Sequence, residues 1–213
     1  EVVAFVAEEG EPLGGTFGSR TFAGLIPEGY KEVTLAALDI TALDIKSSNG
    51  DKGKYIAFLE LHIKQGPFLE RKGLDIGIPS GIVGISRSDI IIRGAANHAG
   101  TTPMSERKDA MRVAADIIHE WFKWMDKQDN IVCNVGKLSV KPGHVSVVPE
   151  EVTFLLELRS LDDISVENAN KVFENLIKLH QKTPCSIEIN SLGSKPAVLL
   201  DQSLVGLIKE TAE

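Results

Sequence analysis

Three absences narrow the classes of protein that this sequence can encode. Positive charge is not in excess, because 23 lysines and arginines stand against 30 aspartates and glutamates. The resulting net charge of −7 argues against a protein that tracks nucleic-acid phosphates. The longest apolar runs, such as 2–7 and 90–92, are far too short for a membrane span, and no secretory signal pattern opens the sequence.

Cysteine is scarce as well. Cys133 and Cys185 supply neither a disulfide framework nor the spacing of a zinc finger, so we expect a cytoplasmic protein. The charge and the short apolar runs described above predict no nucleic-acid and no membrane partner. With 43% hydrophobic residues among 213, the chain is long enough to bury a core as one large domain or two small ones.

Both ends of the sequence lie within expected secondary structure. The chain begins without Met in the strand-like run 1–6 and stops inside an amphipathic helix at its last residues. Because domains seldom begin or end within an element, we expect this sequence to be a piece of a longer protein.

Residues 1–78 have the pattern of an α/β unit. Apolar runs predict buried strands at 1–7 and 55–63, as in a sheet covered on both faces. Helices are expected near 20–23 and over 31–46, and a helical turn up to Lys72.

From residue 79 the pattern becomes richer in strands. The expected elements are strands at 81–86 and 89–93 in a hairpin, a helix from Pro103 (N-cap Thr102) to Met125, strands at 131–140 and 147–158, a helix at 165–180 and a strand at 186–192. Two amphipathic helices among short strands are typical of helices packed on one face of an antiparallel sheet. Segments 1–78 and 193–213 then form one unit into which 79–192 is inserted.

Four places carry side chains able to do chemistry, and each has a structural alternative. Glu8 and Glu9 follow an expected strand. One interpretation makes them a metal ligand and a general base, and the other makes them an acidic surface turn. His62, in an apolar strand, is a metal ligand or a hydrogen-bonded core residue. His98, in a small-residue loop, is an exposed functional imidazole or part of a turn and helix cap. Arg159 grips a carboxylate or forms a structural ion pair.

Taken together and in their order along the chain, four motifs resemble one family. Glu60-Leu-His-Ile-Lys-Gln-Gly-Pro67 is similar to its ELHIEQGP signature, and residues 94–104, followed by Arg107, to its GxANHAGTTPM segment. Residues 2–20 resemble VVAFxxEEG…GSR, and 147–159 resemble NVVP…R. The family is the N-carbamoyl-L-amino acid hydrolase and allantoate amidohydrolase (hydantoinase–carbamoylase) branch of the dinuclear-metal aminoacylases and carboxypeptidases.

The resemblance implies roles for single residues. Glu9 and His62 would be metal ligands, and Glu8 the general base that takes a proton from the metal-bridging water. His98 would reach the active site of the dimer partner and stabilise the oxyanion. The implied substrate-binding residues are Gln65, Asn97, Ser146 and Arg159.

It also implies an architecture and a reaction. Residues 1–78 would be a partial α/β catalytic domain, 79–192 an inserted α+β lid and dimerisation domain, and 193–213 a truncated return segment. The lid would be a four-stranded antiparallel sheet with two helices on one face, forming a homodimer through a helix and an edge strand. With two divalent ions (zinc, manganese, nickel or cobalt), the enzyme would hydrolyse the ureido group of N-carbamoyl-L-amino acids or allantoate, releasing ammonia and CO2.

Some parts of the family pattern are missing or altered. The upstream His-x-Asp and downstream Gly-His-Asp-Ala segments have no counterpart, so we expect the metal pair to be absent or incomplete and these residues alone to be inactive. Lys64 stands where the family has Glu, Ser146 where it has Asn, and Glu11-Pro12-Leu13 where it has Ser-Arg-Phe.

Two other functions are compatible with parts of the pattern. An aminoacylase or dipeptidase of the same superfamily would share the metal ligands, but the ANHAGTTPM segment and Gln65 argue against it. A non-catalytic dimerisation or binding module would keep the lid, but it has no need of Glu8, Glu9, His62 and His98 together.

Overall fold

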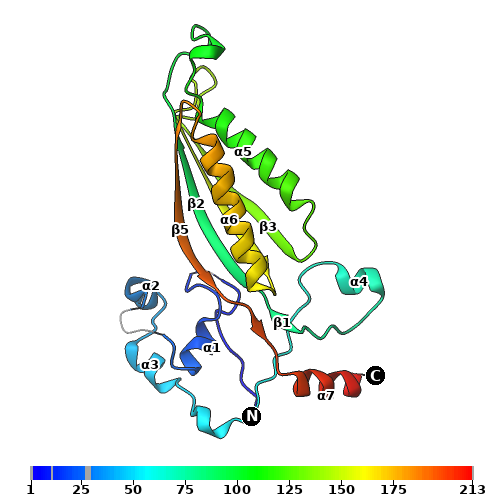
Figure 1. Cartoon of the computed structure of the whole chain (residues 1–213). Coiled ribbons are helices and arrows are strands. Elements are labelled where there is room, and N and C mark those ends of the chain that lie inside the picture. The colour runs from blue at the N-terminus through cyan, green and yellow to red at the C-terminus, as the bar shows by residue number, and fades with distance from the viewer. Residues whose placement is uncertain (1, 11, 27–29, 213) are drawn as a thin grey trace. The chain divides into compact units, whose positions relative to one another are not determined.

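The computed structural model describes residues 2–10, 12–26 and 30–212. The expectations that involve Glu1 and Glu11 lie outside these residues. The chain (Figure 1) divides into two compact units, residues 1–65 and 66–213. No described helix combines the length and the apolar character needed to cross a membrane.

The first unit consists of short helices and loops. Its helices are α1 (Phe17–Phe22), α2 (Glu32–Ala37), α3 (Ala42–Ser47) and the 3-10 turn η1 (Lys52–Lys54). A small apolar core joins them, made of Leu13, Phe17 and Leu35. The single helix predicted over 31–46 is wrong, because Asp39 has a φ of 55° and Thr41 caps a second helix through Asp44.

The strands predicted at 1–7 and 55–63 are also wrong for the residues that the structure describes. A strand needs a neighbour to accept its backbone hydrogen bonds, and the described part of the first unit contains no strand. The side chains of Ile56 and Leu61 are consequently fully exposed. The α/β interpretation of residues 1–78 is therefore not confirmed.

The second unit is built on a four-stranded antiparallel sheet. Its strands are β2 (Gly84–Arg93), β3 (Ile131–Lys141), β4 (Glu151–Ser160) and β5 (Ser186–Lys195), in the order β3-β4-β2-β5. Helices α5 (Ala110–Met125) and α6 (Asp163–His180) lie along the sheet (Figure 1). The remaining elements are α4 (Phe68–Lys72), η2 (Met104–Glu106), α7 (Gln202–Ala212) and a small sheet of β1 (Gly81–Ile82) with β6 (Val198–Leu199).

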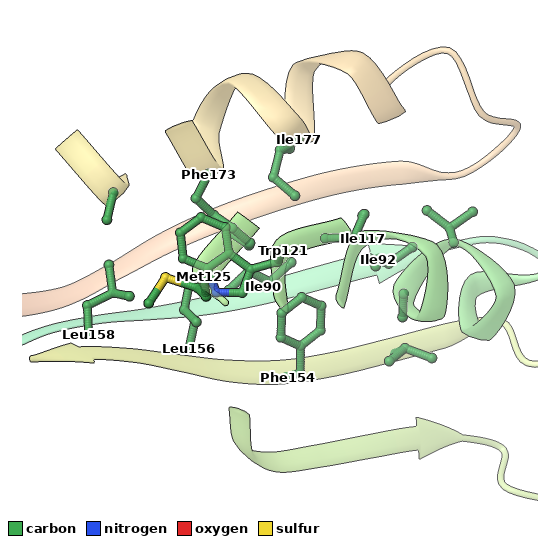
Figure 2. Packing of buried hydrophobic residues seen from close by; sticks show 14 of the residues in the cluster. Ile90, Ile92, Ile117, Trp121, Met125, Phe154, Leu156, Leu158, Phe173 and Ile177 are labelled. Carbon is green, nitrogen blue, oxygen red and sulfur yellow. The ribbon is translucent and has the colours of Figure 1, made fainter. Parts of the chain in front are cut away.

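One hydrophobic core holds both helices to the same face of this sheet. Alternate residues of β4 are buried, as expected for a strand with one covered face. Trp121 of α5 contacts Phe173 of α6 edge-on, with ring centroids 5.0 Å apart, and both point into the cluster drawn in Figure 2. The predicted four-stranded antiparallel sheet with two helices is confirmed.

Several predicted boundaries in this unit need correction. Residues 81–93 do not form a hairpin. β1 pairs with β6, and β2 is one continuous strand that pairs with β4 without a register shift. Its pairing with β5 shifts between Arg87 and Ser88, where β5 carries the extra residue Leu192. β4 begins at Glu151 rather than at residue 147, because residues 146–148 pair with the loop at 97–99 instead.

The long helix α5 begins at Ala110, not at Pro103. Pro103 and Arg107 have extended backbones, with ψ of 145° and 134°. The N-cap is Asp109 rather than Thr102, and its carboxylate accepts hydrogen bonds from the N–H groups of Met111 and Arg112. Residues 94–109 therefore form a connection without α-helix, which contains the 3-10 turn η2 and carries His98.

Gly94 is required where three segments cross. A Cβ at this position would lie 1.9 Å from the carbonyl oxygen of Lys108 and 3.1 Å from Sγ of Cys185. The Gly94 N–H donates to the Glu150 carbonyl at 2.7 Å, and the Ala95 N–H donates to the Lys108 carbonyl at 2.9 Å. This crossing fixes the start of the His98 loop.

We expect Gly94→Ala to lower the free energy of unfolding by about 1–3 kcal/mol, because the backbone must shift to admit the methyl group. The measurement is chemical denaturation of the 213-residue chain, followed by the fluorescence of Trp121 and Trp124 on α5. Gly206→Ala in α7 is the matched control: its Cβ would meet no atom within 4 Å, so no loss is expected. Equal stability of the two variants would contradict the claim that the crossing requires glycine at position 94.

Candidate functional site

Glu8 is held in place by the segment that follows it. The backbone N–H and the hydroxyl of Ser19 donate to its two carboxylate oxygens, at 2.9 and 2.8 Å. Gly18 allows this approach, because a Cβ there would lie 2.8 Å from the backbone of Val6 and 3.1 Å from Oε1 of Glu8. Glu8 is half-buried, so its carboxylate is fixed but not sealed from solvent.

Glu9, His62 and Gln65 meet in the first unit although more than fifty residues separate Glu9 from the other two. Nε2 of His62 lies 2.8 Å from one carboxylate oxygen of Glu9, and the Gln65 amide donates to the other at 3.1 Å. All three side chains are exposed. The structure thus brings together three of the residues singled out in the sequence.

The protonation of His62 is constrained from its other nitrogen. Nδ1 lies 2.7 Å from the carbonyl oxygen of Ile63, which can only accept, so Nδ1 carries a hydrogen. This backbone bond is the main cause that raises the pKa of His62, and the bond to Glu9 adds to it. In the neutral ring the lone pair therefore sits on Nε2, the nitrogen that faces Glu9.

Glu9 and His62 fit part of a divalent-metal site. Imidazole nitrogen and carboxylate oxygen are the donors that zinc, manganese, nickel and cobalt accept, and a backbone carbonyl on the far nitrogen is the usual support for a ligating histidine. Among the described residues no group of three or more such donors comes together. The described residues therefore supply two candidate ligands and not a complete site.

In the second unit, a short antiparallel contact brings the other candidate residues together. His98 and Val147 form an isolated antiparallel β-bridge. On either side of it, the Ala99 N–H donates to the Ser146 carbonyl and the Val148 N–H donates to the Asn97 carbonyl, both at 2.8 Å. Asn97, His98 and Ser146 thus lie on two paired loops.

The His98 imidazole has a defined tautomer. Its Nδ1 accepts a hydrogen bond from the Gly100 N–H at 3.1 Å, so the neutral ring carries its hydrogen on Nε2. The side chain is exposed. His98 therefore presents a hydrogen-bond donor to whatever occupies the space in front of it.

His144 supports Ser146, a contact that the sequence analysis missed. The Ser146 N–H donates to Nδ1 of His144 at 3.3 Å, and the Ser146 hydroxyl is hydrogen-bonded to the same nitrogen at 2.9 Å. The only signal in the sequence was the spacing of two residues between them.

Arg159 lies on the open face of β4 and is already paired. Its Nε donates to Glu157 at 2.6 Å, and the second oxygen of Glu157 accepts from Arg87 on β2 at 2.6 Å. Arg87 stands directly opposite Glu157 in the β2–β4 register, and Asn134 faces Glu157 from β3. Partial burial disfavours the charged carboxylate, but the bonds from Arg159 and Arg87 outweigh it and lower the pKa of Glu157.

The Glu157 pairs should make the stability of this unit depend on acidity. Since the folded-state pKa lies below the ordinary value of 4.5, the contribution is present above that value and is lost as the pH falls through the folded-state pKa. We expect Glu157→Gln to cost about 1 kcal/mol at neutral pH and progressively less in acid. Denaturation curves at several pH values measure this. Glu167→Gln, at a position in no ion pair among the described residues, is the control, and a difference that stays constant with pH would contradict the assignment.

Comparison with known proteins gives the class of this second unit. Residues 80–184 match the family model described as a peptidase dimerisation domain (M20_dimer). An N-carbamoyl-L-amino acid amidohydrolase of Geobacillus stearothermophilus is 41% identical over 172 residues, covering 76% of this chain and 42% of the relative. Allantoate deiminase 1 of Glycine max is 30% identical, covering 100% of this chain and 51% of the relative.

A solved structure agrees over nearly the whole chain. The hydantoinase/carbamoylase family amidase from Burkholderia ambifaria superimposes with a TM-score of 0.82 at 28% identity, covering 98% of this chain and 53% of that one. Residues 80–184 are thus similar to dimerisation domains of the M20 type. The resemblance of the chain to the hydantoinase/carbamoylase amidohydrolases is confirmed. The chain spans about half the length of the relatives it matches.

Proposed function

We propose that the full-length protein is a metal-dependent amidohydrolase that cleaves the ureido group of an N-carbamoyl-L-amino acid or of allantoate. The observation that carries this proposal is the cluster of Glu9, His62 and Gln65. One water is consumed: its oxygen joins the ureido carbon, the terminal C–N bond breaks to release ammonia, and the remaining carbamate loses CO2. The names of the relatives support this reaction class.

Glu9 and His62 would hold a divalent cation, one of a pair in the full-length protein. Such an ion polarises the carbonyl and lowers the pKa of water, which a ureido carbon requires because two nitrogens feed electrons into it. The described residues hold only part of this site, so we infer that the 213 residues alone neither bind the metal pair tightly nor turn over substrate.

Glu8 would act as the general base. Ser19 fixes both oxygens of its carboxylate, which aims the group without neutralising it. Glu8 would take the proton from the attacking water and pass it to the departing ammonia.

Four polar residues are proposed, each by itself, as substrate-binding residues. Gln65 would offer its amide, and Arg159 the free end of its guanidinium fork to a carboxylate, since the bond to Glu157 engages its Nε. Asn97 and Ser146, on the paired loops of the second unit, are the other two.

We propose that residues 79–192 form the lid of a homodimer, inserted between the catalytic segments 1–78 and 193–213. The edges of its sheet are β3 and β5, and a helix beside an edge strand would make the dimer contact. His98 of one protomer would serve the active site of the other, where its Nε2–H donates to the developing oxyanion. Both cysteines are free thiols, which suits the cytoplasmic location that we propose.

The test is ammonia release by the full-length, manganese-loaded protein. The panel contains allantoate, several N-carbamoyl-L-amino acids and an N-acetyl-amino acid, with Glu9→Gln as the control for ammonia that does not come from the metal site. Ammonia from one ureido compound, lost in the control, supports the proposal. Cleavage of the N-acetyl compound alone would overturn it in favour of an aminoacylase, and silence on the whole panel would overturn it in favour of a binding module.

A further inference from the structure

The turn that follows His98 is held by a single arginine. Residues 98–102 fold back on themselves, with the Thr101 and Thr102 N–H groups donating to the His98 carbonyl at 3.3 and 3.1 Å. Within this turn lies Gly100, whose N–H donates to Nδ1 of His98. The tautomer of His98 therefore depends on the shape of the turn.

Arg107 spans the turn from the Ala99 carbonyl to the Thr102 carbonyl. One terminal nitrogen of its guanidinium donates to the Ala99 carbonyl, and its Nε donates to the Thr102 carbonyl at 3.0 Å. Because a guanidinium is planar and rigid, two such bonds fix the separation of the two carbonyls. Gly100 lies between them.

The surroundings of Arg107 indicate that holding the turn is its role. It forms no ion pair with the described residues, and both of its side-chain hydrogen bonds go to backbone carbonyls of the turn. It is half-buried, and desolvating a permanent charge is costly unless those bonds compensate it.

Arg107 is itself anchored on rigid structure. Its backbone is extended and leads into Lys108, whose carbonyl accepts from Ala95, and into Asp109, which caps α5. The guanidinium is thereby tied to the first turn of a long core helix. Displacement of the His98 turn would have to break bonds to this fixed point.

We propose that Arg107 is a positioning residue for His98. By bridging the Ala99 and Thr102 carbonyls it keeps the Gly100 N–H on Nδ1, so that the hydrogen of the imidazole stays on Nε2 and the ring keeps one orientation. This proposal rests on the proposed function for the catalytic use of His98, but the hold on the imidazole stands on the geometry alone.

The first readout is the imidazole itself. Nitrogen NMR of the histidine-labelled full-length protein distinguishes the two tautomers, with His98→Ala identifying the His98 signals. We expect Arg107→Ala to give mixed tautomers at His98 and Arg107→Lys to restore the tautomer only in part, because an ammonium cannot bridge both carbonyls. Arg112→Ala removes an exposed arginine from the first turn of α5 and should leave the His98 signals unchanged. Unchanged His98 signals in Arg107→Ala would overturn the proposal.

The second readout is a double-mutant cycle on ammonia release. We expect Arg107→Ala to lower kcat about 10- to 100-fold, the order of effect of a misplaced catalytic group, with little change in KM and partial rescue by added guanidinium ion. In the His98→Ala background, Arg107→Ala should cost almost nothing more, because it acts through that residue. An equal loss in both backgrounds would overturn the proposal in favour of a general structural role.

The two readouts separate this inference from the function on which it rests. A tautomer change at His98 in a protein that cleaves no ureido compound would uphold the role of Arg107 and overturn the proposed function. An active enzyme in which Arg107→Ala leaves the His98 signals intact would do the reverse.

Discussion

Glu8→Gln is expected to lower ammonia release by the full-length protein about 10²- to 10⁴-fold, the range found for removal of a general base. The amide has the shape of the carboxylate and its oxygen can still accept from Ser19, so the fold should be unaffected. Metal content should also be unchanged, because Glu8 takes part in neither of the contacts that Glu9 makes.

The neighbouring residue provides the matched control for this result. Glu9→Gln should lose activity together with bound metal, since Glu9 is the proposed ligand beside His62. Activity assays paired with metal analysis of both variants measure the difference. If Glu8→Gln lost metal in step with activity, or kept most of its activity, the assignment of Glu8 as base would be wrong.

His98→Ala is expected to lower kcat about 10²- to 10³-fold, the cost of removing one oxyanion donor, with bound metal retained. The exposed position of His98 and its Nε2–H tautomer fit a donor that acts only when substrate is present. Steady-state kinetics on the ureido substrate measure the change, and a larger effect on KM than on kcat would contradict a role in the transition state.

Another histidine distinguishes this effect from the general effect of removing an exposed imidazole. His119 is exposed on α5 and is not one of the candidate site residues, so His119→Ala should keep wild-type activity. A similar loss in both variants would show that activity is sensitive to any histidine replacement in the second unit and would remove the argument for His98.

The elements of the second unit were predictable because local patterns coincide with tertiary packing. The spacing of Ala110, Ala114, Ile117 and Trp121 gives α5 one apolar side, and that side is buried. The alternation in β4 likewise matches its covered and open faces. Where the pattern failed, as at the start of α5, the cause was non-local backbone bonding: the Ala95 N–H donates to the Lys108 carbonyl, and the Ala110 N–H donates to the Pro149 carbonyl.

In the first unit, local pattern and structure disagree. The apolar run 55–63 has strand composition, but composition cannot supply a paired neighbour, and the described residues of that unit contain no strand. Of the candidate site, the sequence predicted the residues, and the structure added the contacts that orient them. Ser19 beside Glu8, His144 beside Ser146 and Arg107 beside the His98 turn were not predictable, because each contact depends on chain folding rather than on residue type.

In the proposed dimer, one active site combines Glu8 of one protomer with His98 of the other. Mixing Glu8→Gln and His98→Ala protomers tests this claim, because a mixed dimer then contains one site with both residues intact. Random pairing predicts recovery of about a quarter of wild-type ammonia release from two variants that are each nearly inactive, since half of the dimers are mixed and one of two sites is restored in each. A mixture no more active than its components would contradict the claim.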